Sequence, residues 1–136
     1  MKAQAAIEYI SISLIGALLF TVLFFISADF MGGRSFEGSL SQARLTVTSL
    51  TDAANEICLQ PQGSKTEVLL PVPLHIDPMN SSVANRTVAF ALRYKDRLEF
   101  VSATSRCELN GSLPSVGGTY AFEVEREATA VNITAK

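Results

Sequence analysis

The chain has 136 residues, with 11 Lys and Arg against 13 Asp and Glu, and a net charge of −2. A chain of this length holds one modest domain. The nearly balanced charge and the lack of a basic patch argue against binding to nucleic acid.

The first predicted element is an apolar helix over Tyr9–Ala28. These twenty residues carry no charge, and a helix of that length spans about 30 Å, one hydrocarbon thickness. Lys2 is the only basic residue before it, and no A-x-A cleavage site follows it, so an ordinary secretory signal is not indicated. We expect the segment to be retained. Lys2 before it and Asp29 after it favour a cytoplasmic N-terminus and an exterior C-terminal domain.

A second helix is predicted over residues 32–60. Gly32 and Gly33 predict a break or a kink after the apolar segment. Pro61 and Gly63 predict where the helix stops. Alternating steps of four and three, which are typical of an amphipathic helix, separate the apolar residues Phe36, Leu40, Ala43, Val47, Leu50, Ala54 and Ile57. If the glycines only bend the chain, one helix would run from about Gln4 to Leu59.

Residues 61–136 change to the two-residue period of strands. Strands are predicted within "TEVLLPV", "TVAFALRY", "RLEFVSAT", "GGTYAFEVERE" and "TAVNITA". Pro71 and Pro73 predict that the first of them is short or lies at an edge, and a tight turn at Lys95-Asp96 predicts a hairpin. We expect an α+β fold, in which the stripe of the second helix covers a small antiparallel β-sheet or β-sandwich.

The two cysteines are Cys58 and Cys107. In an exported domain an even number of cysteines indicates a disulfide, which would here join the end of the second helix to the sheet. The alternative is a pair of buried thiols. Their spacing fits no metal site.

Four of the five asparagines begin an N-x-S/T triplet: Asn80, Asn85, Asn110 and Asn132. Such triplets are acceptor sites for N-glycosylation on the surface of exported proteins. The alternative is that Asn, Ser and Thr merely share the same loops.

The sequence contains no recognisable catalytic arrangement, so we expect no enzyme, no cofactor and no metal. The single histidine, His75, lies between prolines and is expected in a loop or strand rather than as a catalytic base. Glu123, Glu125 and Glu127 alternate along a predicted strand, as acids do on a solvated face.

The N-terminal stretch "KAQAAIEYI" resembles the type IV pilin superfamily, in particular archaeal pilins with a class III signal peptide. The pattern is carried by Lys2, Ala3, Gln4 and Glu8 ahead of the apolar helix, and Ala6 departs from the serine that is frequent there. "TDAANEICLQPQGSKTEVLLPV" also looks like the passage from helix to sheet in these proteins. The resemblance implies that a prepilin peptidase removes residues 1–3 by cutting between Ala3 and Gln4. Residues 4–31 would then be the transmembrane and filament-core helix, 32–60 the amphipathic helix, and 61–136 the exterior β domain.

Glu8 has a physical reason in this setting. A carboxylate inside a bilayer costs about 2.5–3.5 kcal/mol at the centre and less near the headgroups. Cutting before Gln4 creates an α-amine with a pKa near 8, and an ion pair at 4 Å with an effective dielectric near 20 gains about 4 kcal/mol before desolvation. In the family, the glutamate is thought to pair with the N-terminus of a neighbouring subunit. The alternative is that Glu8 simply lies at the membrane interface.

The function expected from this resemblance is that of a structural subunit of an archaeal type IV pilus-like surface filament. The subunit would be inserted in the cytoplasmic membrane as a precursor, would be handled by the peptidase and the pilus assembly machinery, and would have a role in surface adhesion. Its partners would be copies of itself, with no nucleic acid. The alternatives are a membrane-anchored surface or binding protein that never polymerises, and a minor pilin-like component of assembly.

Overall fold

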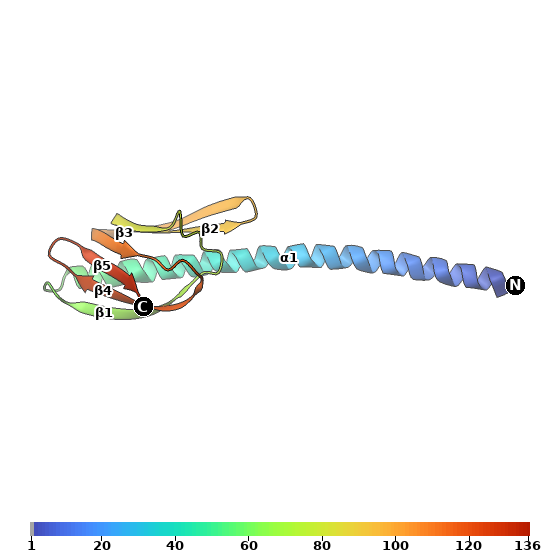
Figure 1. Ribbon diagram of the computed structural model, residues 1–136, viewed down its shortest axis with the longest axis horizontal. Coiled ribbons are helices and arrows are strands. Elements are labelled where there is room, and N and C mark those ends of the chain that lie inside the picture. The colour runs from blue at the N-terminus through green and yellow to red at the C-terminus, as the bar shows by residue number, and fades with distance from the viewer. Residues whose placement is uncertain (1) are drawn as a thin grey trace. The chain divides into compact units, whose positions relative to one another are not determined.

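The computed structural model describes the backbone of residues 2–136, and side chains outside 1–7, 29, 32 and 33. One helix, α1 (Lys2–Cys58), is followed by five strands: β1 (Lys65–Val72), β2 (Ser82–Tyr94), β3 (Arg97–Ser112), β4 (Gly118–Arg126) and β5 (Val131–Ala135). The chain forms two compact units, Met1–Ser35 and Phe36–Lys136, and each is described here by itself. Figure 1 labels these elements.

The double glycine does not break the helix. α1 is helical through Gly32 and Gly33, so the predicted break is wrong, and the alternative of one helix from about Gln4 to Leu59 is close to the observed Lys2–Cys58. A glycine inside a helix costs only about 1 kcal/mol relative to alanine, which is too little to end a helix that continues strongly on both sides. α1 ends at Cys58, just before Pro61.

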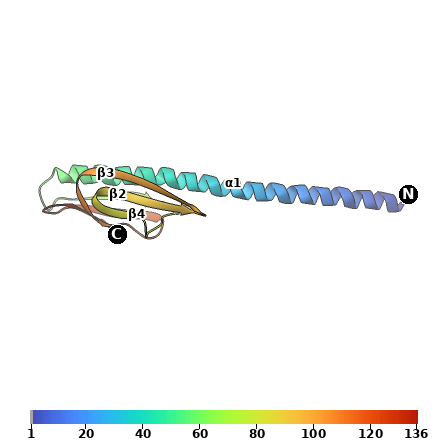
Figure 2. The same ribbon diagram turned by 90° about the horizontal axis from the view of Figure 1, so that it is seen from above.

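The second unit consists of the C-terminal part of α1 packed on one five-stranded sheet. Figure 2 shows from above that this part of α1 runs along the sheet. The predicted stripe of α1 forms the helix side of the core, with six of its seven members buried and Leu40 packed against them. On the sheet side, Val88, Phe90 and Leu92 of β2 are fully buried, as their alternation predicts. The α+β class is therefore confirmed, with two layers sharing one core.

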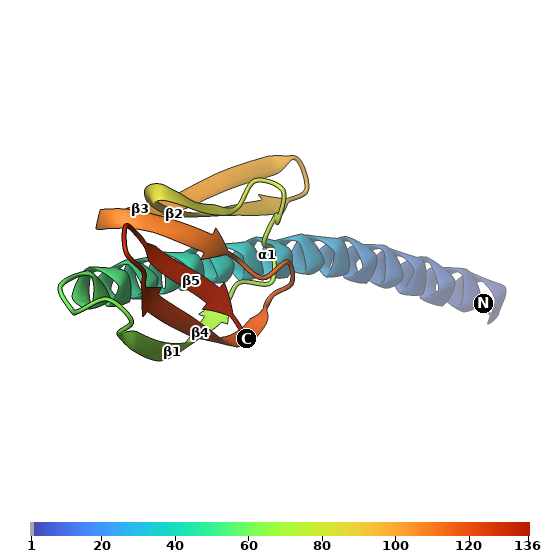
Figure 3. The same ribbon diagram turned by 60° about the vertical axis from the view of Figure 1, so that its left-hand side comes forward.

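The sheet is mixed, and this corrects the prediction of an antiparallel sheet or sandwich. Its strand order is β1-β4-β5-β3-β2. β2 and β3 form the expected hairpin around Lys95 and Asp96, and β1 is an edge strand, one of the two outcomes predicted from Pro71 and Pro73. β4, however, is not a neighbour of β3, because β5 lies between these two strands (Figure 3). β5 therefore pairs antiparallel with β4 and parallel with β3.

Glycine at position 111 allows the parallel pair to close. Gly111 has φ +149°, and a Cβ atom there would lie 2.0 Å from the carbonyl oxygen of Ile133 on β5. No side chain fits in that space, so only glycine lets the end of β3 approach β5.

Candidate functional site

The apolar part of α1 is the most exposed hydrophobic surface of the first unit. Among the described residues, one helical segment, Glu8–Ala28, is long and apolar enough to cross a membrane. The large apolar side chains on all sides of the helix between positions 9 and 31 are each 48% to 75% exposed. A helix that is apolar on every side is stable only when something other than water surrounds it. This segment can therefore anchor the chain in a membrane.

A polar side chain inside the apolar segment forms its hydrogen bond within the helix. The Thr21 hydroxyl donates to the carbonyl oxygen of Ala17 at 2.8 Å, a bond within the helix that needs no water. At the C-terminal end, the Arg34 guanidinium lies 4.5 Å from the centre of the Phe30 ring. An arginine over an aromatic ring suits the boundary between apolar and polar surroundings.

Gly16 leaves a notch in the apolar surface. A Cβ built at this position would meet no atom within 4 Å, so the fold of this chain does not require a glycine there. Small residues in apolar helices allow a second helix to approach closely. The notch is therefore available to a partner helix.

Glu8 is exposed on α1 at the first position of the apolar segment. A carboxylate therefore stands at the start of the apolar segment, as the sequence predicts. The side chains of Ala3 and Gln4, the predicted processing site, lie outside the described residues, as does that of Asp29. Cleavage before Gln4 and the pairing of Glu8 with a second chain stay predictions.

The end of α1 is fastened to β3 by the predicted disulfide between Cys58 and Cys107, whose Cα atoms are 6.4 Å apart. Beside it, the Asn55 Oδ1 atom accepts hydrogen bonds from the Ser105 hydroxyl at 2.9 Å and the Arg106 backbone N–H at 2.8 Å. Asn55 is the one asparagine outside an N-x-S/T triplet, and its amide has this structural role. The alternative of two free thiols is thus wrong.

The four triplet asparagines lie in the second unit. Asn80 is in the loop before β2, Asn85 is on β2, Asn110 is on β3, and all three are exposed. Asn132 is half-buried on the central strand β5. The prediction that it points away from the core is confirmed, because its neighbours Val131 and Ile133 are the fully buried ones.

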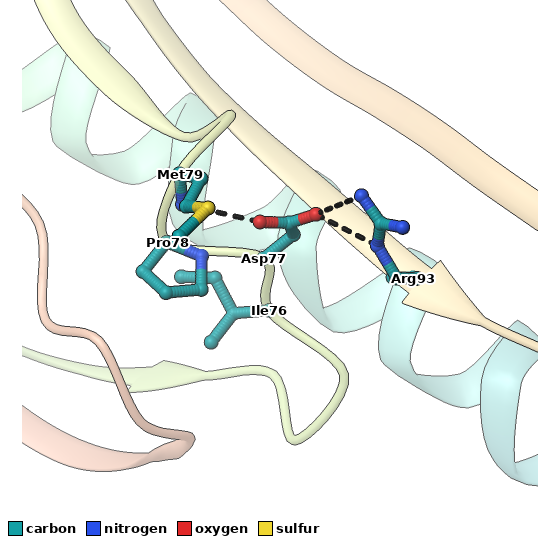
Figure 4. A pocket seen from close by; sticks show the side chains of 5 residues that line it. All are labelled: Ile76, Asp77, Pro78, Met79 and Arg93. Atoms are coloured by element: carbon teal, nitrogen blue, oxygen red, sulfur yellow. Dashed lines mark hydrogen bonds and ion pairs between the residues drawn. The ribbon is translucent and has the colours of Figure 1, made fainter.

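In the loop between β1 and β2, residues 73–81, Asp77 forms an ion pair with Arg93 of β2 that was not expected from the sequence (Figure 4). The Asp77 carboxylate accepts from the Arg93 guanidinium at 2.7 and 2.8 Å, and from the Asn80 side chain and the Met79 backbone N–H at 3.1 Å each. The hydrogen bond from Arg93, followed by that from Asn80, holds the pKa of Asp77 below its ordinary value. An open cavity of about 400 Å³ lies here, lined by Ile76, Asp77, Pro78, Met79 and Arg93. Because the carboxylate is committed to these donors, the cluster fastens the loop rather than offering a free acid.

His75 lies in a turn of the same loop, as predicted. Its Nδ1 atom is 3.0 Å from the Ser39 hydroxyl of α1, and its ring packs edge-on against Phe36 and Tyr94. The backbone N–H of Arg93 also donates to the His75 carbonyl at 2.8 Å. His75 therefore joins the loop to both α1 and β2.

The acids of β4 are engaged in ion pairs. Lys65 lies 2.9 Å from Glu125 and 3.5 Å from Glu123, and Lys136 also contacts Glu123. The hydrogen bond from Lys136 is the main reason that the pKa of Glu123 is lowered. Glu127 lies beyond the end of β4 and is exposed. Among the described residues, no three His, Cys, Asp or Glu side chains are grouped so that they could hold a metal ion.

The comparisons with known proteins identify no family. No protein-family model matches this sequence, and no curated protein or solved structure is significantly similar to it.

Proposed function

We propose that this chain is a structural subunit of an archaeal type IV pilus-like surface filament, in which the apolar part of α1 forms the core and the β domain the exterior. The observation that carries the proposal is the exposed apolar segment Glu8–Ala28, which begins with an acid and belongs to the same helix whose C-terminal part builds the core of a compact β domain. One helix thus supplies both an assembly surface and the attachment of the domain.

Lipid and neighbouring subunits would cover the apolar segment in turn. As a precursor in the cytoplasmic membrane, the chain would keep its apolar side chains in lipid and Glu8 near the headgroups. After the peptidase has cut before Gln4 and the assembly machinery has extracted the subunit, helices of other copies would replace the lipid. The notch at Gly16 supports close helix approach in that state.

Glu8 would set the position of each subunit against the next. In a dry bundle, an acid at the edge of an apolar segment needs a cation, and the α-amine of Gln4 on a neighbouring chain is of the right charge. Leaving either group unpaired in such a bundle costs several kcal/mol. The pair would thereby select one register.

The exterior domain suits a place outside the cell. The disulfide persists in oxidising surroundings, and exposed N-x-S/T triplets suit an exported surface. Adhesion would belong to this domain.

The test compares Glu8→Ala with Glu37→Ala, an exposed glutamate of α1 outside the apolar segment. Surface fibres are sheared from cells that make each variant. Immunoblots compare the amount of the chain in the sheared fibres with the amount in the membrane fraction, and N-terminal sequencing identifies the first residue of the fibre chains. We expect wild-type fibres that begin at Gln4, a Glu8→Ala protein that is inserted and cut but gives few fibres, and a Glu37→Ala protein with normal yield.

Three results would count against the proposal. Sheared fibres whose chains keep Met1 would remove the processing step. A normal fibre yield from Glu8→Ala would remove the pairing role. A wild-type protein that stays monomeric in the membrane fraction would instead support the alternative of an anchored surface module that does not polymerise.

A further inference from the structure

Two N-x-S/T triplets lie side by side, residue for residue, on neighbouring strands. The parallel pairing of β3 with β5 sets Asn110 opposite Asn132, Gly111 opposite Ile133, and Ser112 opposite Thr134. Residues directly opposite each other in a sheet have their side chains on the same face, and neighbouring strands are about 4.8 Å apart. The two asparagines and the two hydroxyls therefore form adjacent pairs on one face.

This register is fixed from the other face of the sheet. Leu109, Val131 and Ile133 are fully buried in the core, so a shift by one residue would turn these side chains to solvent. Gly111 keeps the two strands close, because any side chain there would collide with the backbone of Ile133. Asn110 and Asn132 are held next to each other on the face away from the core.

The two asparagines differ in access. Asn110 is exposed, and its partner on the side of β2 is Ala84, which leaves room beside it. Asn132 is half-buried on the central strand, between Asn110 on β3 and Glu125 on β4. A substituent therefore fits more easily on Asn110.

We infer that Asn110 and Asn132 form one glycosylation site that carries a single glycan, preferentially on Asn110. A pyranose ring with its equatorial hydroxyls is wider than the spacing between the two strands, so a sugar on one asparagine covers the other. This inference rests on the proposed function only in that the β domain must be exported to where glycans are transferred.

The transfer joins the Nδ2 atom of asparagine to the anomeric carbon of a lipid-linked sugar phosphate. The bond between that carbon and the phosphate oxygen breaks, the lipid phosphate leaves with the electron pair, and one amide proton is lost to a base. The sugar donor is therefore a glycan on a lipid phosphate or pyrophosphate carrier.

Asn80 and Asn85 are internal references, because neither lies opposite another triplet asparagine. Asn85 is exposed on the edge strand β2 at an irregularity, with φ 56°. Asn80 uses one N–H of its amide for Asp77. Sugar on either of them would report that the chain has reached the transferase.

The experiment is glycopeptide and intact-mass spectrometry of the full chain from sheared fibres of an N-glycosylating archaeal host. Wild type is compared with Asn110→Gln and Asn132→Gln, which give the occupancy of each asparagine when the other cannot be modified. We expect Asn110 to be the main modified residue in wild type, and doubly modified chains to be far rarer than the product of the two single occupancies. In Asn110→Gln, the chain should carry one glycan fewer or carry that glycan on Asn132.

Gly111→Ala adds a test of the cause. It keeps both triplets intact as acceptor sequences but pushes β3 away from β5, so the doubly modified fraction should rise. The Asn→Gln pair does not depend on whether this variant folds.

The inference is overturned if doubly modified wild-type chains reach the product of the single occupancies, or if Asn132 is the main modified residue. It is also overturned if fibres carry sugar on Asn80 or Asn85 alone, or on none of the four. A host that yields no fibres would count against the proposed function instead, and the same mass measurement on the membrane fraction would still decide the glycan question.

Discussion

Replacing Leu50 by alanine tests whether the C-terminal part of α1 is the cover of the sheet. Leu50 is fully buried in the core between α1 and the strands, whereas Leu45, five residues earlier on the same helix, is 68% exposed. Alanine favours helix slightly over leucine, so neither change weakens the helix itself. The two variants therefore differ in packing alone.

The expected effect follows from that difference in burial. Removing a fully buried leucine side chain loses its transfer free energy and leaves a cavity, which together cost about 2–5 kcal/mol. The same change at an exposed position stays within about 0.5 kcal/mol. We expect Leu50→Ala to lower the free energy of unfolding of the β domain by the larger amount and Leu45→Ala to leave it unchanged.

Amide hydrogen exchange of the full chain in detergent is the measurement. Peptides from β4 and β5 report opening of the sheet without interference from the apolar segment, which detergent keeps helical. In Leu50→Ala, exchange of their slowest amides should accelerate between about 30-fold and 4,000-fold. Equal protection in the two variants would refute the assignment of α1 to the core, since a helix that only lay near the sheet would not distinguish these positions.

Two further predictions concern the disulfide and the Asp77–Arg93 ion pair of the β domain. The double replacement of Cys58 and Cys107 by serine removes a disulfide with a sequence separation of 49, which should lower the free energy of unfolding by about 4 kcal/mol. Thermal unfolding of this variant and of the wild type, each with and without reductant, measures the loss. A wild type whose unfolding temperature does not change with reductant would contradict the prediction. Arg93 lowers the pKa of Asp77 in the folded protein. The ion pair between them therefore stabilises the fold above the unfolded pKa of about 3.9, and this stabilisation is lost as the pH falls through the lower pKa of the folded state. Amide hydrogen exchange in residues 76–81 should therefore become faster below the folded-state pKa in wild type but not in Asp77→Asn.

The elements with a regular period could be predicted from the sequence, because the residues that face the core recur at the spacing of a helix or a strand. The stripe from Phe36 to Ile57 and the alternation of Val88, Phe90 and Leu92 each reflect one face of a regular element turned to a core. The disulfide could be expected for a different reason, since the only two cysteines of the sequence can form a disulfide within the chain only with each other.

Strand order could not be predicted in the same way. Consecutive strands are neighbours more often than not, and this led to an antiparallel sheet, whereas β5 lies between β3 and β4. The one available sign was Gly111 inside a strand, which indicates a close approach of another backbone. The Asp77–Arg93 pair was missed because its members are 16 residues apart and no local pattern links them.

For the candidate site, the sequence located the exposed apolar segment and the acid at its start, since both are local properties of α1. The proposed partner of Glu8 belongs to another chain, and no pattern within one sequence specifies the geometry of such a pair. The adjacency of Asn110 and Asn132 likewise depends on the pairing of strands 22 residues apart, so four triplets that look equivalent in the sequence are not equivalent in the fold.

The position of β5 has a consequence for the order in which the domain forms. It is the last of the five strands in the chain, yet it lies in the middle of the sheet, between β4 and β3. Until Val131–Ala135 has left the ribosome, the pair β2–β3 and the pair β1–β4 have no strand to join them, and each exposes an unpaired inner edge. The five-stranded sheet can therefore be completed only when its last strand takes its place between β4 and β3.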